Sequence, residues 1–170
     1  DVFGVLSTLK EDKSHGPDGL HPIILKRLAK EWTQPFTVLF QKSMESGRLP
    51  KEWKRANVSP VYKKGCKTEA GNYRPVALTS IPCKLMEAVI KEKIVHHIED
   101  KNLFTPHQHG FTRHKSCLTN LLETLEDWTT SLERGYGVDV LYLDYQKAFD
   151  TVPHLCLLKK LQWYGVSEKI

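Results

Sequence analysis

The segment LYLDYQKAFDTV occupies residues 141–152 and joins an apolar run to two carboxylates. Its valine and leucine content, together with Val138 and Val140 just before it, predicts a strand over 138–145. That strand would carry Asp144 near its end. A carboxylate buried there alone would be costly, so Asp144 needs a cation, a basic side chain or a helix N-terminus as its partner.

Composition favours one folded domain with a sizeable core. The chain has 170 residues, of which 40% are hydrophobic and 26% charged, and this balance disfavours disorder. No apolar run approaches the roughly 18 residues of a membrane span, and no signal peptide is visible. The chain begins without a methionine, and we interpret it as a piece of a longer protein.

The metal-ligating residue types do not form a recognisable zinc or disulfide pattern. None of the four cysteines belongs to a C-x-x-C pair, which favours reduced thiols in an intracellular protein. Five histidines gather in one part of the chain, but at spacings that disfavour a metal site; they are His96, His97, His107, His109 and His114.

Positive charge is concentrated in residues 51–75, which contain seven basic residues and only two acidic residues. The net charge of the whole chain is +5, so the remainder is close to neutral. Such a segment suits phosphate groups of nucleotides or nucleic acids, and a solvated basic loop is the equal alternative.

Apolar spacing, glycines and prolines predict a mixture of helices and strands without regular alternation, which is typical of the α+β class. Helices are expected in six segments, namely 2–10, 23–28, 36–40 after a division near 32–35 and with an end at Gly47 and Pro50, 84–97, 117–132 with Ser116 as N-cap, and 155–161. A hairpin is expected from extended segments 56–64 and 75–80, with basic residues at its tip, and Asp150 is expected to be a turn or N-cap acid.

Four blocks of sequence carry a resemblance to a known family. They are GPDGLHPIILK at 16–26, KEWKRANVSPVYKKGCKTEAGNYRPVALTSIPCKLME at 51–87, QHGFTRHKSCLTNLL at 108–122 and DVLYLDYQKAFDTVPHLCLLKKLQWYG at 139–165. Their content and order resemble the reverse transcriptase of non-LTR (LINE-type, jockey-like) retrotransposons. The resemblance implies part of a right-hand polymerase, with a helical extension and the start of the fingers at 1–50, fingers at 51–135 and the start of the palm at 136–170.

The resemblance also assigns roles at the LDYQKAFD block. Asp144 matches the family's first metal-ligating carboxylate, and the backbone carbonyl of Tyr145 would assist it. Two Mg²⁺ ions, with Mn²⁺ as an alternative, would hold the attacking and leaving oxygens of nucleotidyl transfer. Phe149 would lie under the nucleotide sugar and exclude a 2′-hydroxyl, and Ala148 would keep the neighbouring space clear. Ordinary core packing of Phe149 is the alternative.

Further contact residues follow from the same resemblance. The triphosphate would be bound by Arg74 and by Lys63 or Lys64, between which strand alternation does not decide. Nucleotide contacts are implied for Gln108 and Gly110, followed by Phe111, and template contacts for Arg113 and Lys115. The segment 14–19 matches the N-terminal extension that contacts template RNA, and the backbone amides of Gly16 and Gly19 are weak candidates for binding phosphate.

The expected function is RNA-directed DNA synthesis in the complete enzyme, with template RNA, primer DNA and dNTPs as partners, in the cytoplasm and nucleus. The chain contains no Asp-Asp pair, which the family's later motif uses to complete the metal site. We therefore expect no polymerisation by these 170 residues alone. A catalytically dead remnant that still binds RNA is the alternative; an unrelated α+β domain and an RNA-templated RNA polymerase are more distant.

Overall fold

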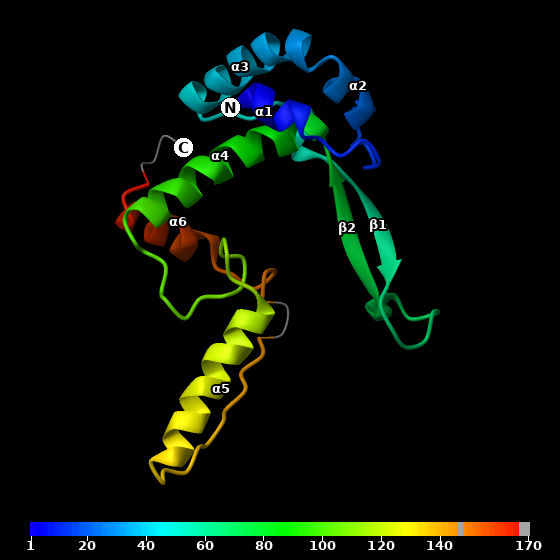
Figure 1. The fold of residues 1–170 in the computed structure, drawn as a ribbon. Helices are drawn as coiled ribbons and strands as arrows, with labels where there is room; N and C mark the ends of the chain where they lie inside the picture. The colour runs from blue at the N-terminus through cyan, green and yellow to red at the C-terminus, as the bar shows by residue number, and fades with distance from the viewer. Residues whose placement is uncertain (146–147, 167–170) are drawn as a thin grey trace. The chain divides into compact units, whose positions relative to one another are not determined.

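The structure, a computed structural model, describes residues 1–145 and 148–166. Over these residues it contains six α-helices and one antiparallel pair of strands (Figure 1), and the predicted α+β class is confirmed. The helices are α1 (Val2–Ser7), α2 (Pro22–Arg27), α3 (Ala29–Ser46), α4 (Ile81–Asp100), α5 (Cys117–Glu133) and α6 (His154–Trp163). No helix in this part of the chain is long and apolar enough to cross a membrane.

The chain divides into two compact units. Unit 1 comprises Asp1–His96 together with Val166, and unit 2 comprises His97–Gly165. The long helix α4 runs through the boundary between them.

The core of unit 1 is built from α1, α2, α3 and the first half of α4. Leu6, Leu25 and Leu85 are almost completely buried in it. A row of aromatic rings continues the core, since Phe36 stacks on Phe40 with ring centroids 5.7 Å apart, and Phe40 meets the edge of Trp53 at 5.8 Å. Burial of these rings and of the three leucines contributes to the hydrophobic driving force for folding of this unit.

The predicted division between two helices near residues 32–35 is wrong. The break lies at Leu28, and α3 continues through Pro35. Proline removes one backbone hydrogen bond and costs about 3 kcal/mol inside a helix. The burial of Phe36, directly after Pro35, and of Phe40, one turn further along the helix, offsets that cost. The predicted end of the helix is confirmed at Gly47, which takes a left-handed conformation with φ of 62°.

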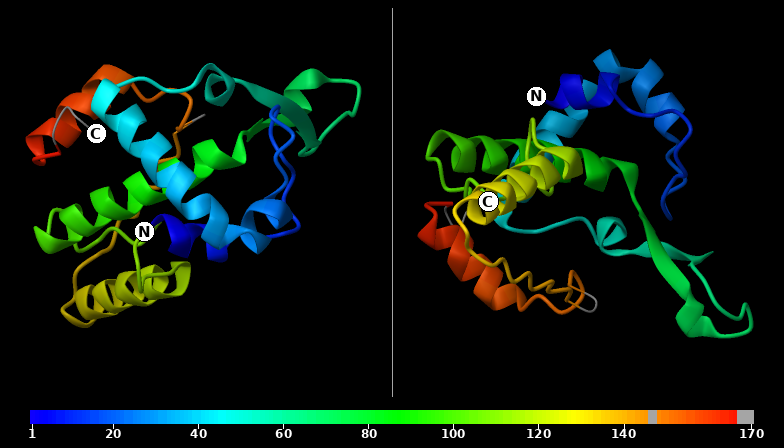
Figure 2. Two further views of the ribbon diagram at one scale, coloured as in Figure 1. Left: turned by 90° about the horizontal axis from the view of Figure 1, so that it is seen from above. Right: turned by 60° about the horizontal axis from the view of Figure 1, so that its bottom comes forward.

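The predicted hairpin is confirmed. Strand β1 (Ala56–Tyr62) pairs antiparallel with β2 (Tyr73–Thr79), and Pro60 faces Pro75 across the pair. Two prolines can occupy facing positions here because, among residues 1–145 and 148–166, no further strand pairs with either side of this two-stranded ribbon. Every residue of β1 is exposed, and Figure 2 shows the ribbon as a twisted arm of unit 1.

Two helix ends in unit 2 are closed by specific hydrogen bonds. Ser116 caps α5 as predicted, because its hydroxyl accepts a bond from the Thr119 amide while the Thr119 hydroxyl accepts one from the Ser116 amide. At the end of α4, Asn102 has φ of 50°, and the Leu103 amide donates to the Ile98 carbonyl. This is the Schellman arrangement that closes many helices.

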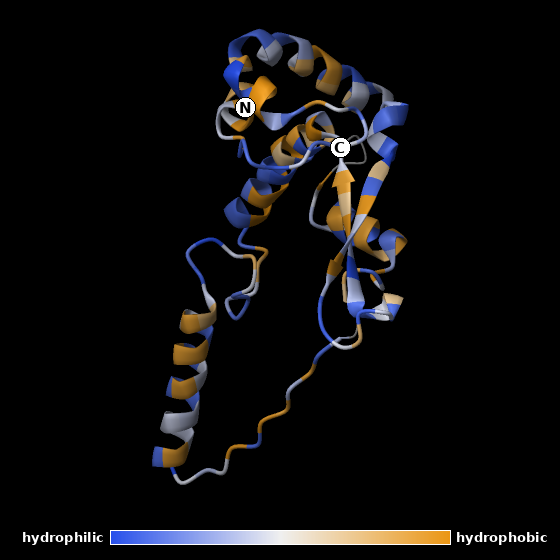
Figure 3. Cartoon of the chain, turned by 90° about the vertical axis from the view of Figure 1, so that its right-hand side faces the viewer, coloured by the Kyte–Doolittle hydropathy of each residue, from blue (hydrophilic) through white to orange (hydrophobic). Residues whose placement is uncertain are grey.

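The predicted strand over 138–145 is wrong. These residues have no assigned secondary structure, and they run from the end of α5 as an exposed segment (Figure 3). Leu141 and Leu143 are 83% and 73% exposed. A strand is stabilised by hydrogen bonds to a neighbour, and the sheet in the described part of the chain consists of β1 and β2 alone.

Candidate functional site

The loop between α4 and α5 in unit 2 carries the predicted contact residues around Gln108. The Gln108 side-chain amide donates to the Gly110 carbonyl at 2.8 Å, which folds the loop back on itself. Phe111 follows with φ of 59° and a side chain that is 97% exposed. A bulky residue at positive φ is unusual and strained, so the loop presents this ring to solvent at a conformational cost.

His109 anchors this loop on α5. Its side chain is buried; Nε2 lies 2.7 Å from Oε2 of Glu123 and Nδ1 lies 3.0 Å from the Thr119 hydroxyl. Since a carboxylate only accepts, Nε2–H donates. Glu123 also contacts the ring of His107 at 3.2 Å. The hydrogen bond from His109, aided by that from His107, holds the pKa of Glu123 below its ordinary value.

Phe111 and Phe149 meet edge to face in unit 2, with centroids 6.1 Å apart and planes at 86°. Phe149 is 79% exposed and follows Ala148 in a turn. The structure thus brings together two sequence motifs that the resemblance associates with nucleotide binding. Core packing as an explanation of Phe149 does not agree with this exposure.

Asp144 lies on the exposed segment before that turn, and Tyr145 beside it is 76% exposed. The helix α6 is capped by Pro153, so Asp150 is a turn residue and not its N-cap. Among residues 1–145 and 148–166, no group of three or more His, Cys, Asp or Glu side chains is arranged to hold a metal ion. Asp144 is therefore not part of such a group among these residues.

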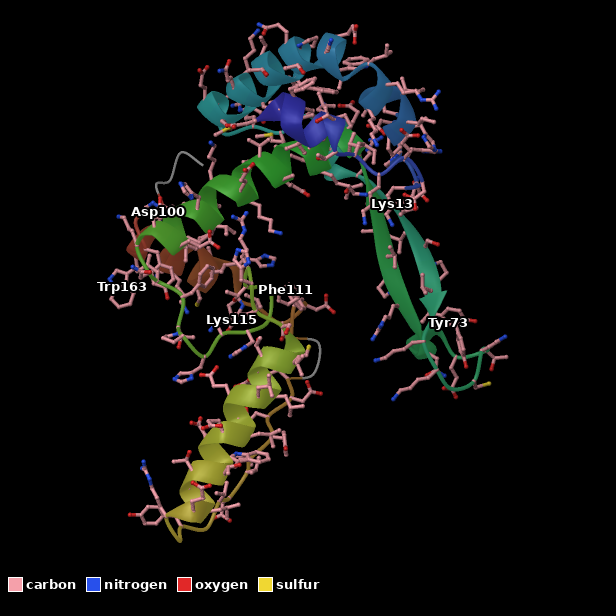
Figure 4. The ribbon with its side chains drawn as sticks, in the orientation of Figure 1. Lys13, Tyr73, Asp100, Phe111, Lys115 and Trp163 are labelled. Atoms are coloured by element: carbon pink, nitrogen blue, oxygen red, sulfur yellow. The ribbon has the colours of Figure 1, made fainter. Side chains whose placement is uncertain are left out.

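The two predicted template contacts, Arg113 and Lys115, lie in different surroundings. Arg113 is exposed, which agrees with a contact role. The ammonium group of Lys115 donates to the Pro106 carbonyl and so closes the loop internally. Figure 4 shows Lys115 and Phe111 on this same loop.

The basic hairpin tip in unit 1 is held by backbone pairing and by a contact between two tyrosine rings. The Lys63 amide donates to the Asn72 carbonyl at 2.9 Å, and Arg74 pairs with Val61 in the register. Tyr73, labelled in Figure 4, packs against the edge of the Tyr62 ring at 5.7 Å. Lys63, Lys64 and Arg74 are all exposed, so the tip holds three cations in solvent on a defined backbone.

The tip contains further ordering contacts. Asn72 donates to the Cys66 carbonyl at 2.8 Å and to the Glu69 carboxylate at 3.1 Å, and Lys67 lies 5.6 Å from the centroid of the Tyr62 ring. Hydrogen bonds from Thr68, its side chain first, lower the pKa of the Cys66 thiol.

Gly16 has a structural explanation. A Cβ at this position would lie 2.5 Å from the Ser80 nitrogen, so the segment 14–19 packs backbone to backbone on the end of β2. Gly19 has φ of 69° and its amide donates to the Gly16 carbonyl, which closes a turn. The close packing of Gly16 accounts for this glycine without a bound phosphate.

Sequence reasoning missed the anchor formed by His109, Thr119 and Glu123. The only signal was the N-cap at Ser116, since Thr119 and Glu123 occupy one face of α5 at helical spacing. The burial of a histidine between glutamine and glycine is not visible in the order of residues.

Comparison with known proteins identifies the family. Residues 61–170 match the family model described as reverse transcriptase (RNA-dependent DNA polymerase). The chain is 27% identical over 163 residues to a probable RNA-directed DNA polymerase from transposon X-element of Drosophila melanogaster, covering 95% of this chain and 18% of that protein. It is 27% identical over 162 residues to the RNA-directed DNA polymerase from mobile element jockey of the same organism, covering 94% and 18%.

A third relative extends the same pattern. The probable RNA-directed DNA polymerase from transposon BS of Drosophila melanogaster is 24% identical over 173 residues, covering 98% of this chain and 19% of that protein. The chain thus spans less than a fifth of the length of these relatives. The resemblance to non-LTR, jockey-like enzymes is confirmed, and the chain belongs to the reverse transcriptase (RNA-dependent DNA polymerase) family.

Proposed function

We propose that this chain is the fingers and the start of the palm of an RNA-directed DNA polymerase of a non-LTR retrotransposon. The complete protein would copy template RNA by extending a DNA primer with deoxynucleoside triphosphates. The observation that carries the proposal is the match of 61–170 to the reverse transcriptase family. In this layout 1–50 is a helical extension with the start of the fingers, 51–135 the fingers, and 136–170 the start of the palm.

The hairpin tip is the proposed triphosphate contact. Arg74 offers two parallel N–H groups to phosphate oxygens, and Lys63 or Lys64 adds a point charge. Their exposure and the hydrogen-bonded backbone around Asn72 support this role, because charges on an ordered tip lose less conformational entropy on binding.

The nucleotide itself is proposed to lie beside Phe149, with Ala148 leaving room for it and Gln108 and Gly110 at its border. Exposure of the Phe149 ring and its contact with Phe111 support a role other than core packing. A fixed ring beside the sugar would exclude a 2′-hydroxyl by steric overlap. Arg113 and Lys115 are proposed template contacts, with Lys115 acting mainly through the shape of its loop.

Divalent ions are the proposed cofactor, Mg²⁺ first and Mn²⁺ as the alternative, with Asp144 and the Tyr145 carbonyl among their ligands. The described residues do not by themselves fit two such ions, because hard cations need several oxygen ligands and no metal-binding cluster occurs among them. Further carboxylates have to come from outside these residues.

The decisive experiment is primer extension on an RNA template by the complete protein, comparing wild type with Asp144→Asn. Loss of one metal ligand should abolish synthesis and leave template binding within about twofold. Asp139→Asn is the matched control, since it removes the same charge from the same exposed segment. Full synthesis by the Asp144 variant contradicts the proposal, and template binding without synthesis by wild type favours the dead remnant.

A further inference from the structure

A pocket of about 480 Å³ opens in unit 1, between the end of α1, the start of α2, the end of β2 and the start of α4. Its floor is aliphatic and is formed by Val5, Leu9, Pro22, Leu78 and Ile81. Pro22 and Ile81 are buried, and Val5 and Leu9 pack against the core. The floor is therefore continuous with the core of unit 1, and the volume lies within the range of sites that bind ligands.

The charged groups that line this pocket are all positive. Lys10 and Lys13 come from the loop after α1, where Figure 4 labels Lys13, and Lys84 comes from the first turn of α4. Both loop lysines are exposed, and none of the three lysines forms a salt bridge within the described part of the chain. The acidic residues of the same loop, Glu11 and Asp12, do not line the pocket. Three cations thus border an aliphatic surface without a carboxylate to neutralise them.

The loop that carries Lys10 and Lys13 is attached to the rest of unit 1 at two points. The carboxylate of Glu11 lies 3.6 Å from Nζ of Lys26 in α2. Gly16 packs on the backbone before α4, since a Cβ there would lie 2.5 Å from the Ser80 nitrogen. The two lysines are therefore held beside the floor before any ligand arrives, and a preformed site avoids part of the ordering cost of binding.

We propose that this pocket binds an acidic, leucine-containing peptide segment of a partner protein. The aliphatic side chains of the segment would lie on the floor, and its carboxylates would lie at Lys10, Lys13 and Lys84. Protein interfaces commonly combine an apolar centre with a polar rim, and an apolar side chain that fills a pocket contributes much of the affinity. Opposite charges at the rim speed association and select the partner. The inference goes beyond the proposed function, because none of the lining residues is a proposed nucleotide or metal contact.

The chemistry of the lining argues against other occupants. RNA is disfavoured because none of the described lining residues is aromatic, so a base would find no ring on which to stack. A fatty acid offers a single carboxylate to three lysines, whereas a peptide can place several carboxylates around its apolar side chains. A second copy of this chain carries the same net charge of +5, which opposes its approach to a basic surface.

The test is binding of the 170-residue chain to a fluorescently labelled peptide, Asp-Glu-Leu-Leu-Asp-Glu, measured by fluorescence anisotropy. Two further peptides separate the two kinds of contact. Lys-Lys-Leu-Leu-Lys-Lys keeps the leucines and reverses the charge, and Asp-Glu-Ser-Ser-Asp-Glu keeps the charge and removes the leucines. The first peptide should bind saturably, and each of the other two should bind at least about tenfold more weakly.

Variants of the pocket test where the peptide binds. Lys10→Glu combined with Lys13→Glu reverses two exposed charges of the rim and should weaken binding by about tenfold. Leu78→Thr removes part of the floor, keeps a β-branched side chain that suits a strand, and should weaken binding by about fivefold. Circular dichroism checks folding, and the lysine variant carries the test if Leu78→Thr does not fold.

Matched controls lie in the same unit, outside the pocket. Lys30→Glu combined with Lys42→Glu makes the same change of net charge at two exposed positions of α3. Val76→Thr makes the corresponding change on β2, two residues before Leu78, at a side chain that is 41% exposed. None of these three residues lines the pocket, so each control should change affinity by less than about threefold, the effect of net charge at a distance.

Several outcomes overturn the inference. The absence of saturable binding, or pocket variants that behave like the controls, would show that this surface does not select such a peptide. Displacement of the peptide by single-stranded RNA, lost in the Lys10 and Lys13 variant, would identify an RNA site instead. Dodecanoate that competes at lower concentration than unlabelled peptide would identify a site for a small amphiphile. An oligomer in sedimentation that the same variant converts to a monomer would identify a second copy as the occupant. Synthesis by the complete protein, tested at Asp144, judges the proposed function separately.

Discussion

Substituting Gly16 by alanine should destabilise unit 1 for a purely steric reason. Gly16 is buried, and its φ lies outside the left-handed region, so alanine suits its backbone conformation. The added methyl group would nevertheless lie 2.5 Å from the Ser80 nitrogen and 2.6 Å from the carbonyl carbon and oxygen of Thr79. All three atoms belong to the backbone and cannot rotate away as a side chain would.

The size of the effect follows from these distances. Carbon contacts are most favourable at about 3.5–4.0 Å, so the segment 14–19 has to retreat from β2 by about 1 Å. Forced movement of this kind in a packed region costs about 1–3 kcal/mol. We expect Gly16→Ala to lower the free energy of unfolding of unit 1 by that amount.

Urea denaturation followed by tryptophan fluorescence measures the change, since Trp53 lies in the core of unit 1. Two glycines serve as controls because nothing lies within 4 Å of a Cβ built on either. Gly4→Ala, in α1, should be neutral or stabilising by up to about 1 kcal/mol. Gly19→Ala, at φ of 69°, should cost about 1–2 kcal/mol through backbone strain alone. A Gly16→Ala variant as stable as wild type would refute the steric argument, and unchanged stability with weakened RNA binding would instead favour the phosphate-binding hypothesis.

Three other predictions concern single side chains. Pro35→Ala restores a backbone hydrogen bond in α3 and should raise the free energy of unfolding by about 1–3 kcal/mol, which would be seen as a higher urea midpoint. An unchanged midpoint would show that packing around Pro35 already offsets the cost of proline in the helix. Folding lowers the pKa of Glu123 below its ordinary 4.5, so its carboxylate contributes stability above that pH and the contribution is lost as pH falls through the folded-state pKa. Glu123→Gln should flatten this acid limb in denaturation measured from pH 7 to 3, and an unchanged limb would contradict the argument. Burial raises the pKa of the Cys83 thiol to about 11, whereas hydrogen bonds from Thr68 lower the pKa of the Cys66 thiol. Iodoacetamide at pH 8, followed by mass spectrometry, should therefore alkylate Cys66 before Cys83. Faster labelling of Cys83 would refute this order.

The parts of the fold that depend on local chemistry could be predicted from the sequence. Gly47 ends a helix because glycine takes the left-handed conformation at low cost, and Ser116 begins one because its hydroxyl caps free amides. The continuation through Pro35 could not be predicted in this way. It depends on the burial of Phe36 in the tertiary fold, which outweighs the local penalty.

The candidate site could be predicted as a set of residues but not as an arrangement. The resemblance assigned related roles to Gln108 and Phe149, and it is the path of the chain that brings Phe149 to Phe111. The bond between His109 and Glu123 joins positions in a loop and a helix, and no periodicity relates them. The placement of Asp144 as a metal ligand stays a prediction.

The failure of the predicted strand at 138–145 has a physical cause. An apolar run becomes a strand only where a neighbour accepts its hydrogen bonds and covers its side chains, and Leu141 has neither here. The apolar residues of helix α5 are likewise left uncovered, since Leu118, Leu121 and Leu122 are 64%, 54% and 57% exposed although the helix is well capped. Figure 3 shows the hydrophobic bands along this helix. Under the proposed function, polypeptide that pairs with 138–145 would order the segment and fix the direction of the Asp144 carboxylate in one step. Strand formation would then position one ligand of the proposed metal site, and further oxygen ligands would complete it.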